Sequence, residues 1–522
     1  MKNTRDRLAA LTPQQLLGIR RGIEKESLRT LPDGKLALTP HPATLGAALT
    51  HPHITTDFSE SQLELITGVH SRVEDCLAEL RQIHQVIYHE LAAATTGEEM
   101  LWTSSMPCGL PADQTIPIGV YGSSNVGRAK SVYRAGLGHR YGRRMQTISG
   151  IHYNWSMPGL DNADYFALIR NFRRQAFLLL YLFGASPAVC GTFLAGREHD
   201  LEPLGAGSMH LPWATTLRMG KLGYQSQAQS SLAVSYNSLE SYAASLEEAL
   251  TRPYPPYEAI GLRNPEGDYN QLSTTLLQIE NEFYGTIRPK RTIFPGERPL
   301  HALRERGVEY VEVRLMDLNP FLPIGIDAET VRFLDLFLLH CWLQDSSQDT
   351  PAEIAALARN QQATAARGRA PGLQLERGDQ SVALTEWAAH IMGELAEVAP
   401  LLDDACGGRE YALTLHAMQE RLAQPENLPS ARVLAAIQSR YDGSFVDFAR
   451  DQSLQTGQAL RAIPCSQHTV AQYSQWARQS LDRQRAIEAS DTLPFEIYRR
   501  EYTSPERLRP RSRLPQPQTG ED

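Results

Sequence analysis

The sequence predicts an α+β fold, in which an antiparallel sheet carries the functional site and helices pack on its outer side. Strand and helix patterns are mixed over residues 1–330, whereas the chain beyond Asp327 follows helical spacing almost throughout. Several predicted strands carry apolar side chains on one face and charged side chains on the other. We therefore expect a sheet-bearing catalytic region at 1–330, a helical region at 331–505 packed on it as one catalytic unit, and a disordered, Pro-rich tail at 506–522.

Two runs of alternating side chains identify strands. Residues 151–157 (IHYNWSM) place a His and an Asn opposite the apolar side chains, and residues 308–317 (VEYVEVRLMD) place a Glu and an Arg opposite an apolar face. Residues 102–150 are rich in Gly, Ser, Pro and Arg, which predicts long functional loops. Helical spacing predicts helices at 162–183, 236–251, 328–344, 351–367, 384–401, 410–422, 430–439 and 466–490.

Composition and charge argue against several classes of function. The net charge of −8 argues against a nucleic-acid-binding protein, which would present a basic surface. The most apolar run, residues 176–185, has about half of the roughly 20 residues that a membrane-spanning helix needs. The six cysteines show no metal-ligand spacing, so we expect a cytoplasmic protein with mostly reduced thiols.

A pair of glutamates near the N-terminus points to a metal. Glu24 and Glu26 lie two residues apart in the run RGIEKESLR, so on a strand they would share a face. Two adjacent carboxylates repel each other unless a cation lies between them. Mg²⁺ bound by carboxylates and substrate phosphates is the usual enzymatic arrangement, which indicates nucleotide-dependent chemistry.

Further candidate ligands lie on other predicted strands. A single acidic residue on a strand is more often exposed to solvent, and a lone histidine is more often structural than a ligand. Together, however, these residues would form the acidic front of one sheet and a site for more than one metal ion. A histidine in the set would also accept Mn²⁺ in place of Mg²⁺. The candidates are Asp57, Glu64, His152 and Glu312.

Basic and aromatic residues could complete a nucleotide and substrate site. Arg288 and Lys290 form a compact basic cluster, and Arg314 lies two residues beyond Glu312, where it could clamp a phosphoryl group. A solvated basic turn is an equal alternative for the cluster. Four tyrosines in polar, glycine-containing surroundings could form the wall of a pocket for a small polar substrate, although ordinary packing explains any one of them: Tyr121, Tyr133, Tyr224 and Tyr284.

Several long stretches follow one another along residues 16–497. They include GIEKESLR (22–29), HPATLGAALTHPHITTDFSESQLELIT (41–67), SSMPCGLP (104–111), YGSSNVGR (121–128), MQTISGIHYNWSMP (145–158), YLFGASPAVC (181–190), QLSTTLLQIENEFYGTIRPKR (271–291), GVEYVEVRLMDLNPF (307–321) and VRFLDLFLLHCW (331–342). In this order they resemble the glutamate–cysteine ligases (γ-glutamylcysteine synthetases) of the proteobacterial type. The resemblance is weakest between residues 345 and 465.

The resemblance implies a carboxylate–amine ligase whose curved antiparallel sheet is similar to that of glutamine synthetase and forms a funnel around metal ions. It implies Arg314 as the catalytic, phosphate-clamping arginine, with Arg288 and Lys290 as nucleotide contacts. The implied metal ligands are Glu24, Glu26, Asp57, Glu64, His152 and Glu312. The implied pocket for the accepting cysteine is formed by Tyr133, Arg218, Tyr224 and Tyr284, with the arginine pairing with the cysteine carboxylate.

The implied reaction is the ATP-dependent ligation of the γ-carboxylate of L-glutamate to the amine of L-cysteine through γ-glutamyl phosphate. This is the first step of glutathione biosynthesis, and we expect a cytoplasmic monomer that uses Mg²⁺ or Mn²⁺. The alternatives are a related glutamate ligase with another amine acceptor, a metal-dependent phosphohydrolase, and a binding protein that keeps the fold. Acceptor-dependent turnover distinguishes a ligase from a hydrolase.

Overall fold

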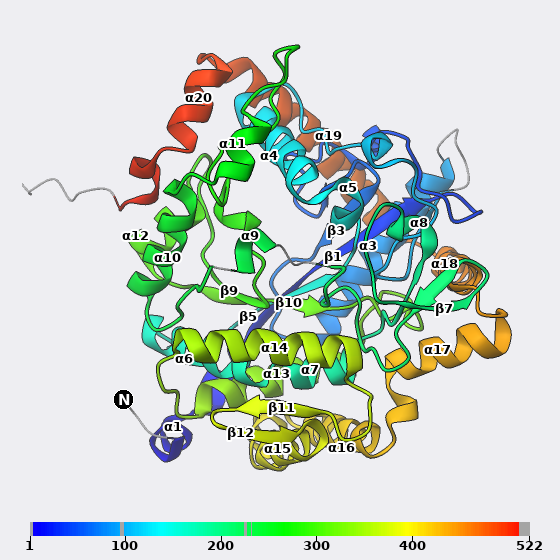
Figure 1. Cartoon of the computed structure of the whole chain (residues 1–522), viewed down its shortest axis with the longest axis vertical. Coiled ribbons are helices and arrows are strands. Elements are labelled where there is room, and N and C mark those ends of the chain that lie inside the picture. Colours follow the sequence, from blue (N-terminus) through cyan, green and yellow to red (C-terminus); the bar gives the residue numbers. More distant parts are fainter. Residues whose placement is uncertain (1–3, 94–98, 224–226, 231, 511–522) are drawn as a thin grey trace, which may run out of the picture.

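The structure is a computed structural model and describes residues 4–93, 99–223, 227–230 and 232–510. Within these residues, seven strands form a central antiparallel sheet in the order β2-β3-β1-β5-β10-β9, with β4 paired to the end of β1 (Figure 1). The strands are β1 (Arg20–Thr30), β2 (Ile54–Thr56), β3 (Gln62–Ile66), β4 (Met100–Leu101), β5 (Ile151–Ser156), β9 (Ile287–Lys290) and β10 (Tyr310–Met316).

Both alternating runs of the sequence are strands, as predicted. On β5, the side chains of Ile151, Tyr153 and Trp155 are completely buried. On β10, Val311 and Val313 are buried in the same way. Because successive side chains of a strand point to opposite faces, the polar residues of both strands share the other face.

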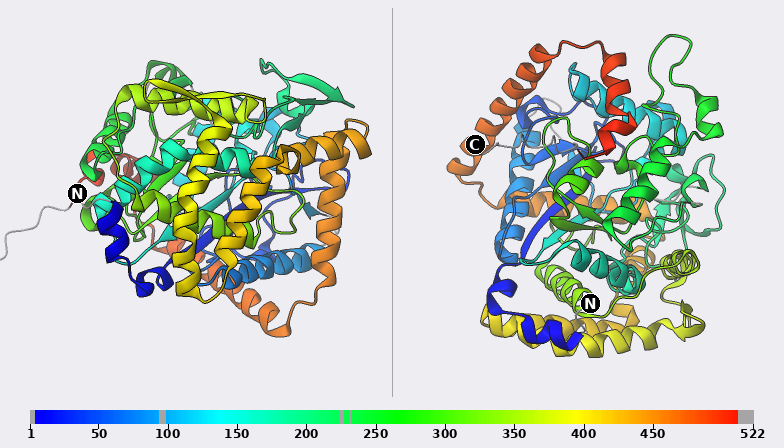
Figure 2. Two further views of the ribbon diagram at one scale, coloured as in Figure 1. Left: turned by 90° about the horizontal axis from the view of Figure 1, so that it is seen from below. Right: turned by 90° about the vertical axis from the view of Figure 1, so that its left-hand side faces the viewer.

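Helices cover the apolar face of this sheet. Helix α3 packs against β1 and β3, and α6 and α7 pack against β10. Helix α13 packs against α3 and α6, and α15 and α16 form an outer layer beyond it (Figure 2). These helices are α3 (Val73–Ala93), α6 (Asn162–Gln175), α7 (Phe177–Phe183), α13 (Ala328–Leu343), α15 (Leu384–Cys406) and α16 (Glu410–Ala423). One buried hydrophobic cluster extends from Leu16 to Leu508 and so joins the sheet region to the helical region.

The polar face of the sheet is enclosed by α4 (Asn125–Tyr141), α10 (Leu239–Thr251), α12 (Pro299–Arg306) and α20 (Phe495–Tyr502). Helix α4 and the short α5 (Arg143–Gln146) correct the expectation of loops over 102–150. The Ser124 side chain caps α4 by accepting from the Gly127 N–H. Apart from Leu137, the buried residues of α4 are small or polar, so the helix lacks the apolar stripe that reveals a helix in sequence.

The predicted helix at 351–367 coincides with α14 (Pro351–Arg367), and the other helical predictions were right in type but differ from the structure at one or both ends. The predicted helix at 162–183 is divided between α6 and α7, and α18 (Phe445–Ala462) was not predicted. The remaining elements are α1 (Thr4–Ala10), α2 (Pro13–Leu17), α8 (Gly191–Leu194), α9 (Gln227–Ser230), α11 (Pro255–Ile260), α17 (Pro429–Arg440), α19 (Gln467–Ser490), β6 (Ala188–Cys190), β7 (Glu202–Gly205), β8 (Ser208–His210), β11 (Gln374–Arg377) and β12 (Gln380–Ala383).

Two further expectations need correction. The tail was expected to be disordered from 506, yet Pro505–Leu508 forms a 3-10 turn in which Leu508 is buried; residues 511–522 lie outside the described residues. Cys108 and Cys190 form a disulfide, whereas the other four cysteines have free thiols. Sequence spacing gave no indication of this pair, because the two residues are 82 positions apart. Among the described helices, none has the length and apolar character required to cross a membrane.

Candidate active site

The register of the central strands gathers acidic side chains on the polar face of the sheet. Glu24 of β1 lies directly across from His152 of β5, and Glu26 lies across from Glu64 of β3. Glu312 of β10 lies across from Asn154 of β5. Directly opposed residues of antiparallel strands point to the same face and bring their side chains within contact distance. Four strands thus contribute to one polar surface.

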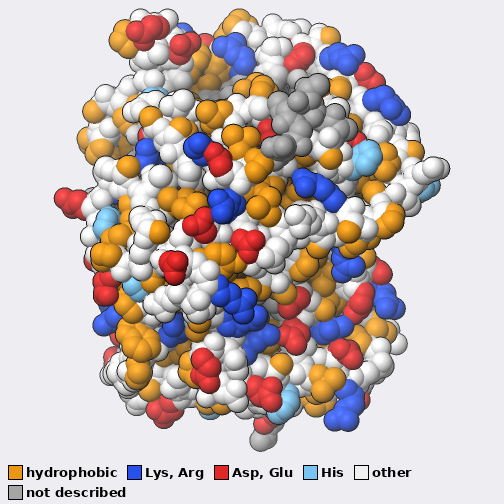
Figure 3. All heavy atoms as spheres, turned by 90° about the vertical axis from the view of Figure 1, so that its right-hand side faces the viewer, with side chains coloured by type: hydrophobic (Ala, Val, Ile, Leu, Met, Phe, Trp, Pro, Cys, Tyr) orange, Lys and Arg blue, Asp and Glu red, His pale blue; other side chains and the backbone are white. Residues whose placement is uncertain are grey.

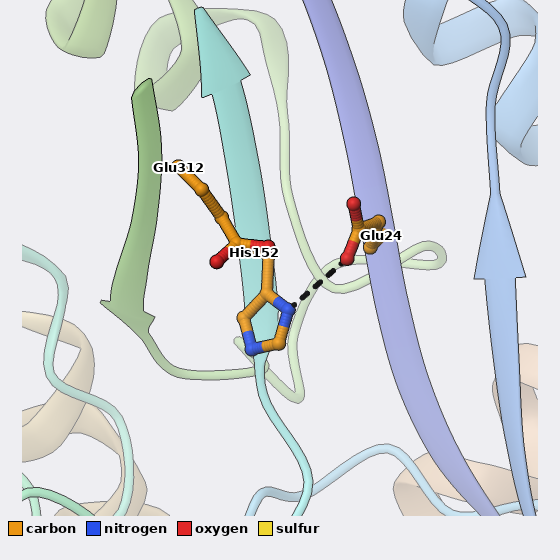
Figure 4. A group of neighbouring side chains, drawn as sticks. All are labelled: Glu24, His152 and Glu312. Carbon is orange, nitrogen blue, oxygen red and sulfur yellow. Dashed lines mark hydrogen bonds and ion pairs between the residues drawn. The ribbon is translucent and has the colours of Figure 1, made fainter. Parts of the chain in front are cut away.

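Glu24, His152 and Glu312 form a tight group (Figure 4), with one ligand atom of each residue within 4.8 Å of the others. The Nδ1 atom of His152 lies 3.3 Å from Glu24 Oε2, and its Nε2 atom lies 3.7 Å from Glu26 Oε1. Burial and the nearby charge of Arg314 lower the pKa of His152. The imidazole is therefore neutral near pH 7 and keeps a lone pair that a metal could use.

Glu26, Asp57 and Glu64 bring further carboxylates to the same surface. Burial, followed by the Asp57 carboxylate, raises the pKa of Glu26 to about 8. Burial, followed by the charges of Glu24 and Asp57, raises the pKa of Glu64 well above its usual range. The Nδ2 atom of Asn154 donates to Glu24, and its buried Oδ1 atom has no hydrogen-bond partner among the residues that the structure describes. A set of crowded carboxylates with spare acceptor oxygens and one imidazole fits hard divalent cations.

Two positively charged side chains border this surface at Glu312. Lys290 Nζ lies 3.1 Å from Glu312 Oε1, and Arg314 Nη1 lies 2.8 Å from Glu312 Oε2. Although burial alone would raise it, these charges hold the pKa of Glu312 well below its usual range. Arg288, the third predicted basic residue, also borders the cavity, but its guanidinium donates to the main-chain carbonyl groups of residues 281 and 283.

The residues predicted to hold the acceptor amino acid lie at one end of the site. Arg218 is almost completely buried; its Nη2 donates to the carbonyl oxygen of Arg314 at 2.8 Å, and its Nη1 lies 3.8 Å from Asp317 Oδ1. It borders a small pocket together with His152, Tyr284 and Arg314. Tyr133 approaches from α4 and lines the main cavity. Tyr224 lies outside the described residues.

A cavity of about 620 Å³ connects these groups. The predicted site residues line it with three exceptions: Arg218 borders the adjoining small pocket, Tyr224 lies outside the described residues, and Tyr121 is buried behind the cavity wall. Tyr121 corrects the expectation of a pocket-wall tyrosine, because its hydroxyl donates to the main-chain oxygens of residues 56 and 57. The cavity has carboxylates along the sheet and basic groups beside Glu312. This arrangement suits a substrate with several phosphates, held through cations between the carboxylates and the phosphate oxygens.

Sequence reasoning missed several residues that line the site, among them Arg134 and Gln146. Arg134 donates from Nε to the main-chain oxygen of Asp57, and its guanidinium lies 4.5 Å from the centre of the Tyr121 ring. Gln146 donates from Nε2 to the Tyr284 hydroxyl at 2.9 Å. Both lie on α4 or α5, which were predicted as loops. Ser124, a residue type that favours the N-cap of a helix, was the available local indication that a helix begins here.

Comparisons with known proteins agree on one family. The family model for glutamate–cysteine ligase matches residues 8–364. The glutamate–cysteine ligase of Alcanivorax borkumensis is 47% identical over 96% of this chain and 99% of its own length, and that of Azotobacter vinelandii is 48% identical over 91% and 93%. The crystal structure of glutamate–cysteine ligase from Francisella tularensis, in complex with AMP, superposes with a TM-score of 0.88 and 35% identity, covering 93% of this chain and 97% of that one.

Proposed function

The chain belongs to the glutamate–cysteine ligase family, and we propose how its site performs that family's reaction. The reaction joins the γ-carboxylate of L-glutamate to the amine of L-cysteine in an ATP-dependent step, the first of glutathione biosynthesis. The family resemblance noted in the sequence is thereby confirmed. The alternatives of another acceptor or a simple hydrolase are not favoured. The observation that carries the proposed mechanism is the strand register that brings four carboxylates and His152 to one face of the sheet, with Asp57 lining the same cavity.

The acidic face is proposed as the metal site. Mg²⁺, or Mn²⁺ because of the imidazole, would be held by Glu24, Glu26, Asp57, Glu64, His152 and Glu312. Bound there, the cations would neutralise the phosphate charge and make the γ-phosphate accessible to a carboxylate. The raised pKa of Glu26 supports this proposal, because burial and the Asp57 carboxylate keep Glu26 protonated up to about pH 8 in spite of Arg218 and Arg314, and a bound divalent cation would favour its ionised form.

The basic side chains are proposed to stabilise the negative charge of the phosphoryl group during its transfer. The γ-carboxylate of glutamate attacks the γ-phosphorus of ATP, and ADP leaves as γ-glutamyl phosphate forms. Arg314, already within 2.8 Å of Glu312, would stabilise the transferring group, while Lys290 and Arg288 would contact the nucleotide phosphates. Positioning and charge neutralisation then account for most of the catalysis.

The pocket beside His152 is proposed for the acceptor. The amine nitrogen of cysteine attacks the acyl carbon, the amine loses a proton, and phosphate leaves as the amide forms. Arg218 would pair with the cysteine carboxylate, and Tyr133, Tyr224 and Tyr284 would surround its side chain. The position of Arg218 and Tyr284 in one pocket supports this assignment.

Several broader features are also proposals. The sheet, with its enclosed polar face, would be the wall of a funnel similar to that of glutamine synthetase. Residues 1–330 and 331–505 would act as one catalytic unit, which the shared hydrophobic cluster supports. The enzyme would work as a cytoplasmic monomer.

Release of ADP by the purified protein tests the acceptor assignment. The assay contains Mg·ATP and L-glutamate, with L-cysteine present, absent, or replaced by 2-aminobutyrate, which has a similar size but no thiol. We expect turnover to require an acceptor, and mass spectrometry to detect γ-glutamylcysteine. Equal ADP release without any acceptor would contradict the proposed coupling of the two half-reactions.

A further inference from the structure

Helix α20, close to the C-terminal end of the described chain, forms part of the wall of the catalytic cavity. Tyr498 and Tyr502 lie one helical turn apart, and both line the cavity. Their rings are 5.8 Å apart and only 8° from parallel, so together they present an ordered aromatic surface, here called the tyrosine pair. Ile497 of the same helix lies outside the cavity lining, and its side chain is 46% exposed.

Buried ionic contacts fix this helix in position. Arg298, which precedes α12, is almost completely buried; it forms an ion pair with Glu280 at 2.7 Å and donates to the Tyr502 carbonyl oxygen at 2.6 Å. Arg499 donates to the Leu272 carbonyl oxygen at 2.6 Å. Helix α20 also contacts α4, and Figure 1 shows it above α12. The tyrosine pair is therefore held in a defined place by segments far apart in sequence.

The cavity wall around the tyrosine pair is largely apolar, whereas the sheet side of the cavity is charged. The lining runs from the basic groups of β9, through residues 291–293, to apolar side chains of α12. The acceptor pocket, in contrast, lies beside His152 and Tyr284. The apolar part of the wall includes Tyr498, Tyr502, Tyr242, Leu246, Leu300 and Leu303.

We propose that the tyrosine pair of α20 binds the nucleoside part of ATP, so that the C-terminal helix is a specificity-determining part of the active site. Of the three substrates, only the nucleotide has a flat, largely apolar group that suits an aromatic wall. The α12 part of this wall follows Arg288 and Lys290 along the chain, and the tyrosine pair lines the same cavity as these basic residues. This inference rests on the proposed function, because it takes the phosphates to lie beside Lys290 and Arg314.

Competition by two partial nucleotides tests the inference. AMP carries the base and ribose, whereas inorganic tripolyphosphate carries only the phosphates, and both are measured as inhibitors against ATP. In the variant with both Tyr498→Ala and Tyr502→Ala, we expect the KM for ATP and the inhibition constant for AMP to rise about tenfold or more. The inhibition constant for tripolyphosphate and the KM values for glutamate and cysteine should change by less than about twofold, because the basic and acceptor groups are untouched.

Two matched variants complete the test. Ile497→Ala, on the exposed side of the same helix, should leave all these constants unchanged, and the double Tyr→Phe variant, which keeps both rings, should retain AMP binding. An unchanged KM for ATP in the double Ala variant would overturn the inference, as would equal weakening of AMP and tripolyphosphate. If the unmodified enzyme fails to join glutamate and cysteine, the proposed function itself is wrong, which is a different result.

Discussion

Single residues of this site show the electrostatic cost of gathering carboxylates. Glu26 has a pKa of about 8 and that of Glu64 is also raised, whereas Glu312 beside Lys290 and Arg314 has a lowered pKa. The site therefore has a part that needs cations and a part where the protein already supplies them. Substrate phosphates and metal ions would meet at the boundary between the two.

Glu26→Gln is expected to abolish turnover while the fold persists. The change removes one ligand charge but keeps the size of the side chain and its ability to accept from the Gly150 N–H. We expect ADP release to fall by at least about a hundredfold, because a metal site that loses a carboxylate binds its cation poorly. Circular dichroism should show native structure, and wild-type activity in this variant would contradict the metal assignment.

The stability of the metal-free enzyme should depend on pH through Glu26. Its pKa is near 4.5 when unfolded and about 8 when folded, so between these values the folded state holds the additional proton. The contribution of Glu26 to the free energy of unfolding is therefore greatest below pH 4.5. It falls by on the order of a few kcal/mol as the pH rises towards 8.

Urea unfolding from pH 5 to pH 8.5 in the presence of a chelator would measure how the free energy of unfolding changes with pH. Glu26→Gln should reduce this pH dependence, and added Mg²⁺ should stabilise the wild type most at the alkaline end. A slope that is the same in both proteins would exclude Glu26 as its source.

At the scale of elements, the sheet is tied to its helices by a buried ionic group. Asp335 of α13 lies 2.9 Å from Arg21 of β1, accepts from the Tyr153 hydroxyl of β5 at 2.6 Å, and accepts from Tyr411 of α16 at 3.3 Å. One carboxylate therefore joins two site-bearing strands to two helices. Arg21 and Tyr153 point to the apolar face of the sheet, opposite Glu24 and His152.

Asp335→Asn should destabilise the protein strongly. It leaves the Arg21 guanidinium buried without its countercharge, which costs about 3–5 kcal/mol. Urea denaturation would measure the loss, and activity below the unfolding transition should survive because the residue does not reach the cavity. The matched change Asp33→Asn, in an exposed pair with Lys35, should unfold like the wild type. Equal effects of the two changes would contradict the structural role.

The strands and helices differ in how well local sequence patterns predicted them. Alternation predicted β5 and β10, and the paired glutamates indicated a metal, because these are local patterns. Which strands would be neighbours is a non-local property: the pairing of Glu26 with Glu64 joins residues 38 positions apart, and nothing in either run specifies it. Helix α4 was missed because its buried face is mostly small residues, and Arg134 was missed with it. That α20 lines the cavity could not be predicted, because its place beside the site is set by tertiary contacts with segments far away in sequence.

At the scale of the whole molecule, one hydrophobic cluster joins the sheet to the helices that follow it in sequence. Helix α13 is almost entirely buried between the inner and outer helices. Charges on the surface are mixed, and the face in Figure 3 shows acidic and basic side chains interspersed among apolar ones.

A fragment ending at residue 330 is expected not to fold. It would lack α13, whose buried side chains cover the helices behind the sheet, and would expose that apolar surface to water. Near-ultraviolet circular dichroism and denaturant titration of the fragment would show this directly. A cooperative transition in the isolated fragment would mean that the two regions are independent domains.

The central claim is that the acidic face of the sheet binds the divalent cations needed for catalysis. Binding of Mn²⁺, followed by electron paramagnetic resonance in the absence of nucleotide, tests it most directly. We expect saturable Mn²⁺ binding by the wild type that weakens at least about tenfold in Glu24→Gln and in Glu26→Gln, with exposed Asp33→Asn unaffected. Unchanged Mn²⁺ binding in both site variants would show that the cations bind elsewhere.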